Sequence, residues 1–423
     1  MATRTQSVAD ICVQAKQASR RLATLDTATK DAALGAIADA VESHTAEILE
    51  ANAGDLEDGR AAGLDAALLD RLALDEARVS QMADGVRDII ALPDPVGEEI
   101  ESRELPNGLE LRKVRVPLGV VAIIYEARPN VTVDAAALCI KSGNAVVLRG
   151  SSTAERSNTV LARVVAEAGE AAGLPVGAVS IVSGGDRDDL TELVRQEGLV
   201  DLVIPRGGDA LKRTLKESAT VPVIYAAAGN CHVYVDASAD PRMASQVAFN
   251  AKVQRPGVCN ASETLLVHSE IAPIVLPELL RDLRQAGVEL HVDGRTRAAA
   301  GSVGDGLLDA TEEDWATEYL GLEMAVKVVD TLDEAIAHVN RYGTGHSEAI
   351  VTQDDDAASA FTEGVDAACV YVNASTRFTD GGEFGMGAEM GNSTQKLHAR
   401  GPIGLRELTT IKYVVRGTGQ VRG

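Results

Sequence analysis

Residues 254–260, with the sequence QRPGVCN, contain the cysteine whose surroundings best suit covalent chemistry. Cys259 follows a proline and a glycine, so its backbone cannot continue a helix and a loop presents the thiol. Thiols near backbone amides and cations ionise more easily, and the thiolate is the nucleophile. Cys259 is therefore a candidate nucleophile, although a buried structural role is the commoner one for a cysteine taken by itself. The other cysteines lie in or beside apolar stretches, which favours the structural role for them.

Residues 125–132, with the sequence YEARPNVT, close a predicted strand and open a predicted helix. Side chains at such a junction face the crevice beyond the carboxyl ends of parallel strands, where ligands bind. Asn130 can donate a hydrogen bond to an oxyanion there, and Arg128 can hold a carboxylate or phosphate through two parallel hydrogen bonds. The alternatives are a helix cap for Asn130 and a surface ion pair for Arg128.

Two further turns have sequences that let the backbone approach a phosphate closely. Residues 148–153 (LRGSST) and residues 204–209 (IPRGGD) each follow a predicted strand and precede a predicted helix, whose first amides attract anions. Neither turn matches the dinucleotide fingerprint or the phosphate-binding loop of nucleotide hydrolases, so cofactor binding and an ordinary turn both stay open. The candidate residues in these turns are Arg149, Ser151, Arg206, Gly207 and Gly208.

A glycine-rich segment over residues 371–387, together with residues 395–402, carries several basic side chains on an acidic chain. Such a group of cations favours the binding of an anion. The alternative is a solvated loop whose cations form ion pairs. The basic residues are Arg377, Lys396, His398 and Arg400.

The pattern of apolar residues predicts the elements that must position these segments. Residues 8–97 show helical spacing, with Thr27 as a candidate cap, and residues 99–121 predict a hairpin around a turn at 106–108. Short apolar runs separated by helix-length segments then predict parallel strands with crossover helices in two α/β units, the second beginning near Ala228. The first set of runs covers residues 120–125, 145–149, 179–182 and 202–205. The second set covers residues 221–225, 232–235, 263–267, 324–329, 348–352 and 369–373.

Composition argues against several classes of protein. A net charge of −23 disfavours general nucleic-acid binding, because phosphate backbones repel acidic surfaces. Five scattered cysteines, without metal-ligand spacing to the seven histidines, indicate neither a disulfide framework nor a zinc site. No apolar stretch is long enough to cross a membrane and the N-terminus is not of the secretory type, so we expect a cytoplasmic protein with no membrane partner. The acidity fits a halophilic source with a high-salt cytoplasm or an ordinary acidic enzyme.

Four segments together resemble the γ-glutamyl phosphate reductases of proline biosynthesis, a group within the aldehyde dehydrogenase superfamily. They are YEARPNVT at residues 125–132, QRPGVCN at 254–260, YVNASTRFTDGGEFGMGAE at 371–389 and STQKLHARGP at 393–402. The resemblance covers nearly the whole chain. It implies an α/β, aldehyde dehydrogenase-like fold with two doubly wound α/β domains and a small β element for oligomerisation.

The same resemblance implies the limits of the domains. Residues 1–98 and 119–227 would form a dinucleotide-binding domain, and residues 228–378 a catalytic domain that carries the nucleophilic cysteine. Residues 99–118 and 403–423 would supply a hairpin and a C-terminal strand for a homo-oligomer. Residues 379–402 would form a loop that returns near the active site.

Carried over position by position, the resemblance makes Cys259 the nucleophile and Asn130 an oxyanion donor. Arg149 falls where many members of the superfamily have a lysine that reaches the adenosine ribose, and an arginine there favours NADPH over NADH. Glu318 resembles the glutamate that binds the nicotinamide ribose. The predicted cofactor-binding residues are Arg149, Ser151, Arg206, Gly207, Gly208 and Glu318. The predicted substrate-binding residues are Arg128, Asn373, Arg377, Lys396 and Arg400.

One departure from the superfamily pattern bears on the reaction. Hydrolytic aldehyde dehydrogenases carry a glutamate base before a Gly-Gly pair, whereas residues 226–231 here read AAAGNC. Without that carboxylate, attack of water on a thioester is not promoted, and phosphate can take the place of water. We therefore expect NADPH-dependent reduction of γ-glutamyl phosphate to glutamate 5-semialdehyde through a cysteine thioester. The alternatives are a hydrolytic aldehyde dehydrogenase and a non-catalytic partner of glutamate 5-kinase, and the labile acyl phosphate favours association with that kinase.

Overall fold

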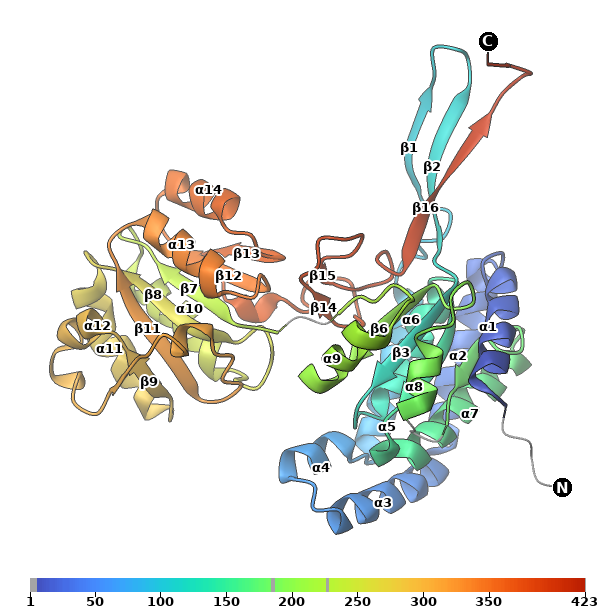
Figure 1. Cartoon of the computed structure of the whole chain (residues 1–423), viewed down its shortest axis with the longest axis horizontal. Coiled ribbons are helices and arrows are strands. Elements are labelled where there is room, and N and C mark those ends of the chain that lie inside the picture. Colours follow the sequence, from blue (N-terminus) through green and yellow to red (C-terminus); the bar gives the residue numbers. More distant parts are fainter. Residues whose placement is uncertain (1–5, 184–186, 226–227, 423) are drawn as a thin grey trace. The chain divides into compact units, whose positions relative to one another are not determined.

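The computed structural model describes residues 6–183, 187–225 and 228–422 (Figure 1). The chain divides into two compact units. Unit 1 comprises Met1–Tyr225, Gly385–Gly391 and Ile403–Gly423, and unit 2 comprises Ala226–Phe384 and Asn392–Pro402. Unit 1 is thus assembled from three stretches of chain, two of which follow most of unit 2 in the sequence.

Unit 1 opens with helices, as the spacing of apolar residues predicts. They are α1 (Val8–Leu22), α2 (Thr27–Ser43), α3 (Thr45–Ala61), α4 (Ala66–Leu72) and α5 (Glu76–Ala91). The buried positions of α2 recur every three or four residues, so one side of this helix packs against α5. The predicted cap at Thr27 is wrong by one position. Asp26 caps the helix instead, because its carboxylate accepts the N–H of Thr29 and satisfies one of the first orphan amides.

A parallel four-stranded sheet with the order β5-β4-β3-β6 forms the core of unit 1. Its strands are β3 (Val120–Tyr125), β4 (Ala145–Gly150), β5 (Val179–Ile181) and β6 (Leu202–Arg206). The helical segments that follow them are α6 (Asn130–Lys141), η1 (Ser152–Ala154), α7 (Glu155–Ala171), α8 (Arg187–Leu193) and α9 (Asp209–Ser218). β3 and β4 are buried along their whole length, which explains their continuous apolar sequences. β4 lies on one side of β3, and β6, which comes later in the sequence, lies on the other side. A topological switch point therefore lies at the carboxyl ends of β3 and β6.

Unit 2 is built on a parallel seven-stranded sheet with the order β10-β9-β11-β8-β7-β12-β13. Its strands are β7 (Cys231–Val235), β8 (Ser262–His268), β9 (Glu289–Val292), β10 (Leu308–Asp309), β11 (Glu323–Val329), β12 (Ser347–Val351) and β13 (Cys369–Val372). Its helices are α10 (Pro241–Val253), α11 (Ala272–Gln285), α12 (Gly294–Ala299), α13 (Leu332–Tyr342) and α14 (Asp355–Gly364). Val233 and Val235 pack with α10 and α11, whereas Tyr234 between them packs with α13 and α14. Helices therefore cover both faces of the sheet (Figure 1).

Two details of the second set of strands differ from the prediction. Residues 221–225 form no strand of this sheet. Val223 makes a single bridge to Val203, and the segment belongs to unit 1. The strands β9 and β10 were not predicted, because their short sequences ELHV and LD lack a run of apolar residues.

The predicted hairpin is confirmed and gains a third strand. β1 (Glu99–Glu104) pairs antiparallel with β2 (Glu110–Pro117), whose other edge pairs antiparallel with β16 (Thr409–Arg416). This three-stranded ribbon extends from the rest of unit 1 (Figure 1). Gly108, at the predicted turn, has a φ of +78°, which favours glycine. A short antiparallel pair, β14 (Asn392–Ser393) with β15 (Gly401–Pro402), lies in unit 2.

The predicted α/β fold class with two parallel sheets is confirmed. The five cysteines, all within the described ranges, form no disulfide. Among the helices described, none is both long and apolar enough to span a bilayer.

Candidate active site

Cys259 lies in unit 2, in the loop that joins α10 to β8. It is partly exposed, whereas the other four cysteines are buried. Burial raises the pKa of the Cys12 thiol to about 12 and raises the pKa values of Cys139 and Cys231 as well, because a thiolate loses its hydration there. These three thiols stay protonated near neutral pH. Cys259 is the cysteine that solvent and small molecules can reach.

The backbone of Gly229 packs directly on that of Cys259. A Cβ at position 229 would stand 1.6 Å from the Cys259 carbonyl oxygen, so only glycine fits there. The Sγ of Cys231 donates to the same carbonyl oxygen at 3.2 Å, and the N–H of Gly229 donates to Glu318 Oε1 at 2.6 Å. Gly229 thus contacts both the predicted nucleophile, Cys259, and the predicted ribose-binding glutamate, Glu318.

A second segment holds the Cys259 loop through its neighbour Asn260. The Asn260 amide donates to the carbonyl oxygen of Thr379 at 2.9 Å, and the Thr376 hydroxyl donates to the Asn260 carbonyl at 2.7 Å. Thr376 begins the short helix η4 (Thr376–Phe378), which also carries Arg377. The loop is therefore held in part by hydrogen bonds that its neighbour Asn260 makes with residues 376–379.

Arg377 supplies positive charge beside the candidate nucleophile. Its Nε donates to Gln254 Oε1 at 2.8 Å, which anchors the guanidinium over the loop that precedes Cys259. Burial and the nearby charge of Arg255 lower the pKa of Arg377, while Asp380 and Cys259 oppose that lowering. A guanidinium remains charged at neutral pH even so. Arg377 is therefore the cationic side chain whose charge interacts with Cys259.

A buried ion pair lies beneath the same loop. Lys252 Nζ and Glu263 Oε2 are 2.5 Å apart and both side chains are fully buried. Burial raises the pKa of Glu263 to about 7 against the opposing charge of Lys252, and burial lowers the pKa of Lys252. The other carboxylate oxygen of Glu263 accepts the N–H of Leu320 at 3.3 Å. Leu320 has a φ of +56°, so this bond holds a strained turn two residues after Glu318.

The remaining predicted substrate residues of unit 2 have other partners. Lys396 and Arg400 both form ion pairs with Asp366, the one with Arg400 at 2.9 Å. The side-chain amide of Asn373 is engaged by Thr352: its oxygen accepts the N–H of Thr352 and its nitrogen donates to the Thr352 carbonyl, each at 2.9 Å. Asn373 has a φ of +58° at the end of β13, where the chain turns back toward η4. These side chains are thus engaged by Asp366 and Thr352, whereas the prediction has them contact the substrate.

Residues of the motif YEARPNVT lie in unit 1, at the carboxyl end of β3. Arg128 and Asn130 are exposed, and Asn130 is the first residue of α6. The amide nitrogen of Asn130 donates to Asp134 at 3.0 Å. Burial raises the pKa of Asp134 to about 6, although the Asn130 bond and the charge of Arg206 act in the opposite direction. An amide nitrogen carries two hydrogens, so this bond orients the group and leaves one N–H to donate.

The turn at the end of β6 already holds an anionic group of the protein. The N–H of Gly208 donates to the carboxylate of Glu126 at 3.2 Å, and a Cβ on Gly207 would stand 2.8 Å from that carboxylate. Arg206 packs against Gly391, where a Cβ would stand 2.2 Å from the guanidinium. These contacts lie at the switch point between β3 and β6. The Glu126 carboxylate occupies the place where an anionic ligand would meet the Gly208 amide.

The turn after β4 offers polar atoms that suit a polar ligand. Arg149 is buried at the end of the strand. Within the described residues, the Ser151 hydroxyl and the Asn158 amide nitrogen are buried without a hydrogen-bond partner, and both line a small hollow with Gly150. A Cβ on Gly150 would stand 2.1 Å from the Asn158 amide nitrogen, so the backbone approaches closely. These donors and this glycine fit the hydroxyl and phosphate groups of a dinucleotide.

Sequence reasoning found the segments of the site but missed several residues that fix them. It did not single out Gly229, Lys252, Glu263 or Asp366 as partners of the predicted residues. The signal that was available for Gly229 is its place before a predicted strand in the stretch AAAGNC. The prediction of a missing carboxylate base rests on residues 226–231, of which Ala226 and Ala227 lie outside the described residues.

Comparisons with known proteins agree on one family. The model of the aldehyde dehydrogenase family matches residues 1–301 and 309–414. A γ-glutamyl phosphate reductase from Thermobifida fusca is 56% identical over 417 residues, which is 99% of each chain. One from Clostridium novyi is 54% identical over 408 residues, covering 96% of this chain and 97% of the relative.

Solved structures place the chain in the same group. The crystal structure of a γ-glutamyl phosphate reductase from Thermotoga maritima superposes with a TM-score of 0.96 at 46% identity, covering 99% of this chain and 100% of that one. An acetylating aldehyde dehydrogenase from Geobacillus thermoglucosidasius shares the fold, with a TM-score of 0.70 at 20% identity. The chain therefore belongs to the aldehyde dehydrogenase family and, within it, to the group of the γ-glutamyl phosphate reductases.

Proposed function

We propose that this chain reduces γ-glutamyl phosphate to glutamate 5-semialdehyde and phosphate, the second step of proline biosynthesis from glutamate, with NADPH and through a thioester on Cys259. The observation that carries the proposal is the position of Cys259. It is the partly exposed cysteine, the backbone of Gly229 packs on its loop, and the charge of Arg377 interacts with it. The names of relatives that are more than half identical supply the substrate class.

In this mechanism the Cys259 thiolate attacks the γ-carbonyl carbon of the acyl phosphate. A carbon–sulfur bond forms, the bond between that carbon and the phosphate oxygen breaks, and phosphate leaves. The N–H of Cys259 would hold the oxyanion during both events, and Asn130 is the side chain that the sequence resemblance assigns to the same role. When bound, the nicotinamide supplies the hydride that reduces the thioester. Cys259 then leaves as a thiolate when glutamate 5-semialdehyde is released.

The proposed reaction also requires that no carboxylate activates water for hydrolysis of the thioester. The described carboxylates around Cys259 are engaged elsewhere: Glu318 accepts from Gly229, and Glu263 pairs with Lys252. We infer from these bonds that neither carboxylate promotes hydrolysis of the thioester. The thioester therefore persists long enough for reduction in one direction and for attack by phosphate in the other.

The residues that would hold the cofactor lie mainly at the carboxyl ends of β4 and β6. Arg149 and Arg206 supply cationic groups and Ser151 a buried hydroxyl, whereas in the turn of Gly207 and Gly208 the Gly208 amide would first have to exchange the Glu126 carboxylate for the cofactor. Glu318, in unit 2, would accept hydrogen bonds from a ribose. The preference for NADPH rests on Arg149, whose guanidinium suits a 2′-phosphate.

Among the substrate residues, Arg377 is the best supported binder of phosphate because it lies by Cys259. Arg128 is exposed and can hold the α-carboxylate. Lys396 and Arg400 would take part only after exchanging Asp366 for the substrate, so we assign them the weaker role.

The proposal is tested by measuring oxidation of glutamate 5-semialdehyde in the reverse direction, with and without phosphate and with either NADP⁺ or NAD⁺. We expect turnover that requires phosphate or arsenate, that prefers NADP⁺, and that Cys259→Ala abolishes. Turnover that proceeds equally without either anion would establish a hydrolytic aldehyde dehydrogenase instead. Full activity of Cys259→Ala would remove the covalent step.

We further propose that the ribbon of β1, β2 and β16 joins copies of the chain. Its side chains are largely exposed, including Ile100, Ile411, Tyr413 and Val415 at 42%, 42%, 55% and 51%. Exposed apolar side chains on a strand pair mark an interface. Light scattering of Tyr413→Arg should give a smaller assembly than the unchanged chain, and an unchanged mass would exclude this surface.

A further inference from the structure

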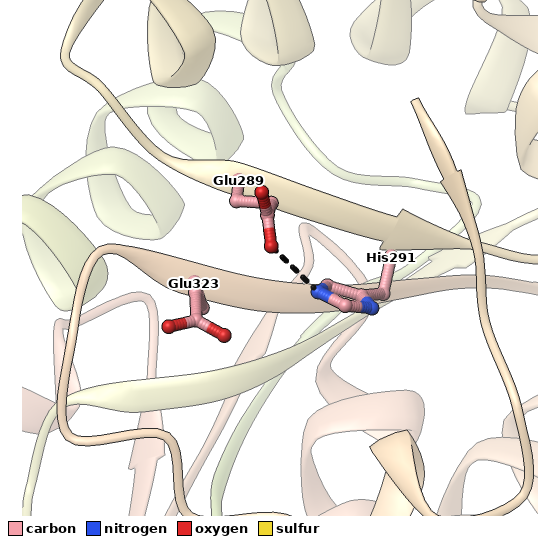
Figure 2. Close-up of side chains that lie close together, drawn as sticks. All are labelled: Glu289, His291 and Glu323. Atoms are coloured by element: carbon pink, nitrogen blue, oxygen red, sulfur yellow. Dashed lines mark ion pairs between the residues drawn. The ribbon is translucent and has the colours of Figure 1, made fainter. Parts of the chain in front are cut away.

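A group of side chains on β9 and β11 has the composition of a metal site and lies outside the residues assigned above. Glu289 and His291 are two positions apart on β9 and so share a face of the sheet. Glu323 is the register partner of Glu289 on the neighbouring strand β11. One ligand atom from each of the three lies within 4.8 Å of the others. Figure 2 shows the three side chains close together on the neighbouring strands.

Asp314 fixes the imidazole of His291 from the side away from this cluster. Its Oδ1 lies 3.0 Å from His291 Nδ1 and also accepts the Tyr319 hydroxyl at 2.8 Å. Its Oδ2 accepts both the N–H and the hydroxyl of Thr311. Asp314 thus accepts hydrogen bonds on both oxygens while facing the Nδ1 edge of the imidazole. The Tyr319 ring packs on the imidazole at a centroid distance of 5.5 Å and limits its rotation.

The other ring nitrogen of His291, Nε2, lies on the side of the two glutamates. Nε2 is buried and, among the described residues, makes no hydrogen bond, while Glu289 Oε1 lies 3.5 Å away. An acceptor nitrogen and two carboxylates therefore face one another (Figure 2). Acceptors placed together in this way need a cation between them, and like charges directly opposite on paired strands destabilise a sheet.

We propose that Glu289, His291 and Glu323 bind a divalent transition-metal ion such as Zn²⁺, with Asp314 orienting the imidazole. Two carboxylates and one imidazole nitrogen are a known ligand set for such an ion, and a carboxylate behind the ligating histidine fixes its tautomer. A divalent ion neutralises both glutamates, which a single proton on His291 does not. Water would complete the coordination, because the Glu289 side chain is 57% exposed.

The ion would be structural in this protein. It would tie β9 to β11 and, through Asp314 and Tyr319, would hold the segment that leads to Glu318. The site is therefore separate from the chemistry proposed for Cys259, and it can be tested without measuring turnover.

The test is calorimetric titration of metal-free protein with Zn²⁺, together with the thermal midpoint of unfolding. Both are measured in a Cys259→Ser background, because a thiolate also binds Zn²⁺. We expect one ion per chain and a higher midpoint with Zn²⁺. Glu323→Gln and Glu289→Gln, which keep the size of the side chain, should each weaken binding at least tenfold. Asp314→Asn should weaken it about 10- to 100-fold with the three ligands retained.

The matched control is His268→Ala, on β8 and outside the cluster, which should leave affinity and stoichiometry unchanged. His291→Ala should abolish binding. If that variant does not fold, the exposed Glu289→Gln serves the same purpose. Absence of stoichiometric binding, or equal affinity in the glutamine variants, would overturn the proposal.

Discussion

Gly229 and Cys259 are in backbone contact: a Cβ on Gly229 would lie 1.6 Å from the Cys259 carbonyl oxygen and 2.6 Å from its Cα. Neither neighbour is the flexible end of a side chain, so neither can yield without moving the loop. The contact joins β7 to the loop before β8 and sets where the thiol stands.

Gly229→Ala is accordingly expected to displace the Cys259 loop. Forced overpacking of this kind lowers the free energy of unfolding by about 1–3 kcal/mol. The measurement is urea denaturation followed by circular dichroism. Gly294→Ala is the matched control in the same unit, because its Cβ would meet no atom within 4 Å. Equal stability of the two variants would show that the contact is looser than described.

Alkylation of the native chain should modify one thiol much faster than the rest. Cys259 is partly exposed, while burial raises the pKa values of Cys12, Cys139 and Cys231 and keeps them as unreactive thiols. Mass spectrometry after brief treatment with iodoacetamide should find a single adduct, located at Cys259. The control is Cys259→Ser, which should show no fast adduct. Rapid labelling of a second cysteine would contradict the burial of the other four.

Breaking the buried pair of Lys252 and Glu263 should be costly. Either Lys252→Met or Glu263→Gln leaves the partner buried without its counterion, and such a loss destabilises a protein by about 3–5 kcal/mol. The double variant Lys252→Met with Glu263→Gln should recover part of this loss, since no uncompensated charge remains. Denaturant unfolding of all four chains provides the thermodynamic cycle.

The exposed pair of Arg341 and Glu312 is the comparison for that cycle. Both of its side chains are 68% exposed, so removing either should change the free energy of unfolding by less than about 1 kcal/mol. A similar effect at both pairs would mean that burial does not govern the energy of the inner one.

Stability should fall in mild acid because of His338. Burial lowers its pKa from 6.5 to about 3, with His232 and Lys327 adding to the effect, and the side chain is 4% exposed. The unfolded chain binds a proton below pH 6.5 and the folded chain does not, so the stabilisation is complete above that pH and decreases as the pH falls toward 3. At pH 5 the loss amounts to about 2 kcal/mol for this residue.

The measurement is the free energy of unfolding between pH 7 and pH 5. His338→Leu should flatten the slope, whereas a change at the half-exposed His268 to Gln should not. The same slope in His338→Leu would assign the acid sensitivity to other groups.

The sequence was most informative where apolar residues form continuous runs. β3 was predicted at its observed limits, because a fully buried parallel strand needs an apolar side chain at every position. β9 was missed because its Glu289 and His291 are polar. The residue that pairs with Glu289 in the sheet is Glu323, which lies on another strand. Pairing between distant segments does not show in a local pattern.

The site divides in the same way. Cys259 and its loop stand out through proline, glycine and cysteine within a few residues. The groups that hold this loop are far away along the chain: Gly229 packs on its backbone and the Thr376 hydroxyl donates to the Asn260 carbonyl, while Glu318 in turn accepts the N–H of Gly229. Contacts to backbone atoms hardly restrict the type of side chain, apart from the need for glycine, so they do not show in the sequence. The sequence does not show that Lys396 and Arg400 form ion pairs with Asp366, because the tertiary structure determines these contacts.

The place of β16 has a consequence for the order in which the protein is made. β16 (Thr409–Arg416) pairs with β2 (Glu110–Pro117). β2 therefore cannot complete this pairing until a segment that follows almost all of unit 2 has been synthesised. Unit 2 lies almost wholly between them in the sequence and has its own core. During synthesis unit 2 can therefore finish folding first, as an insertion within a domain whose outer sheet is still one strand short.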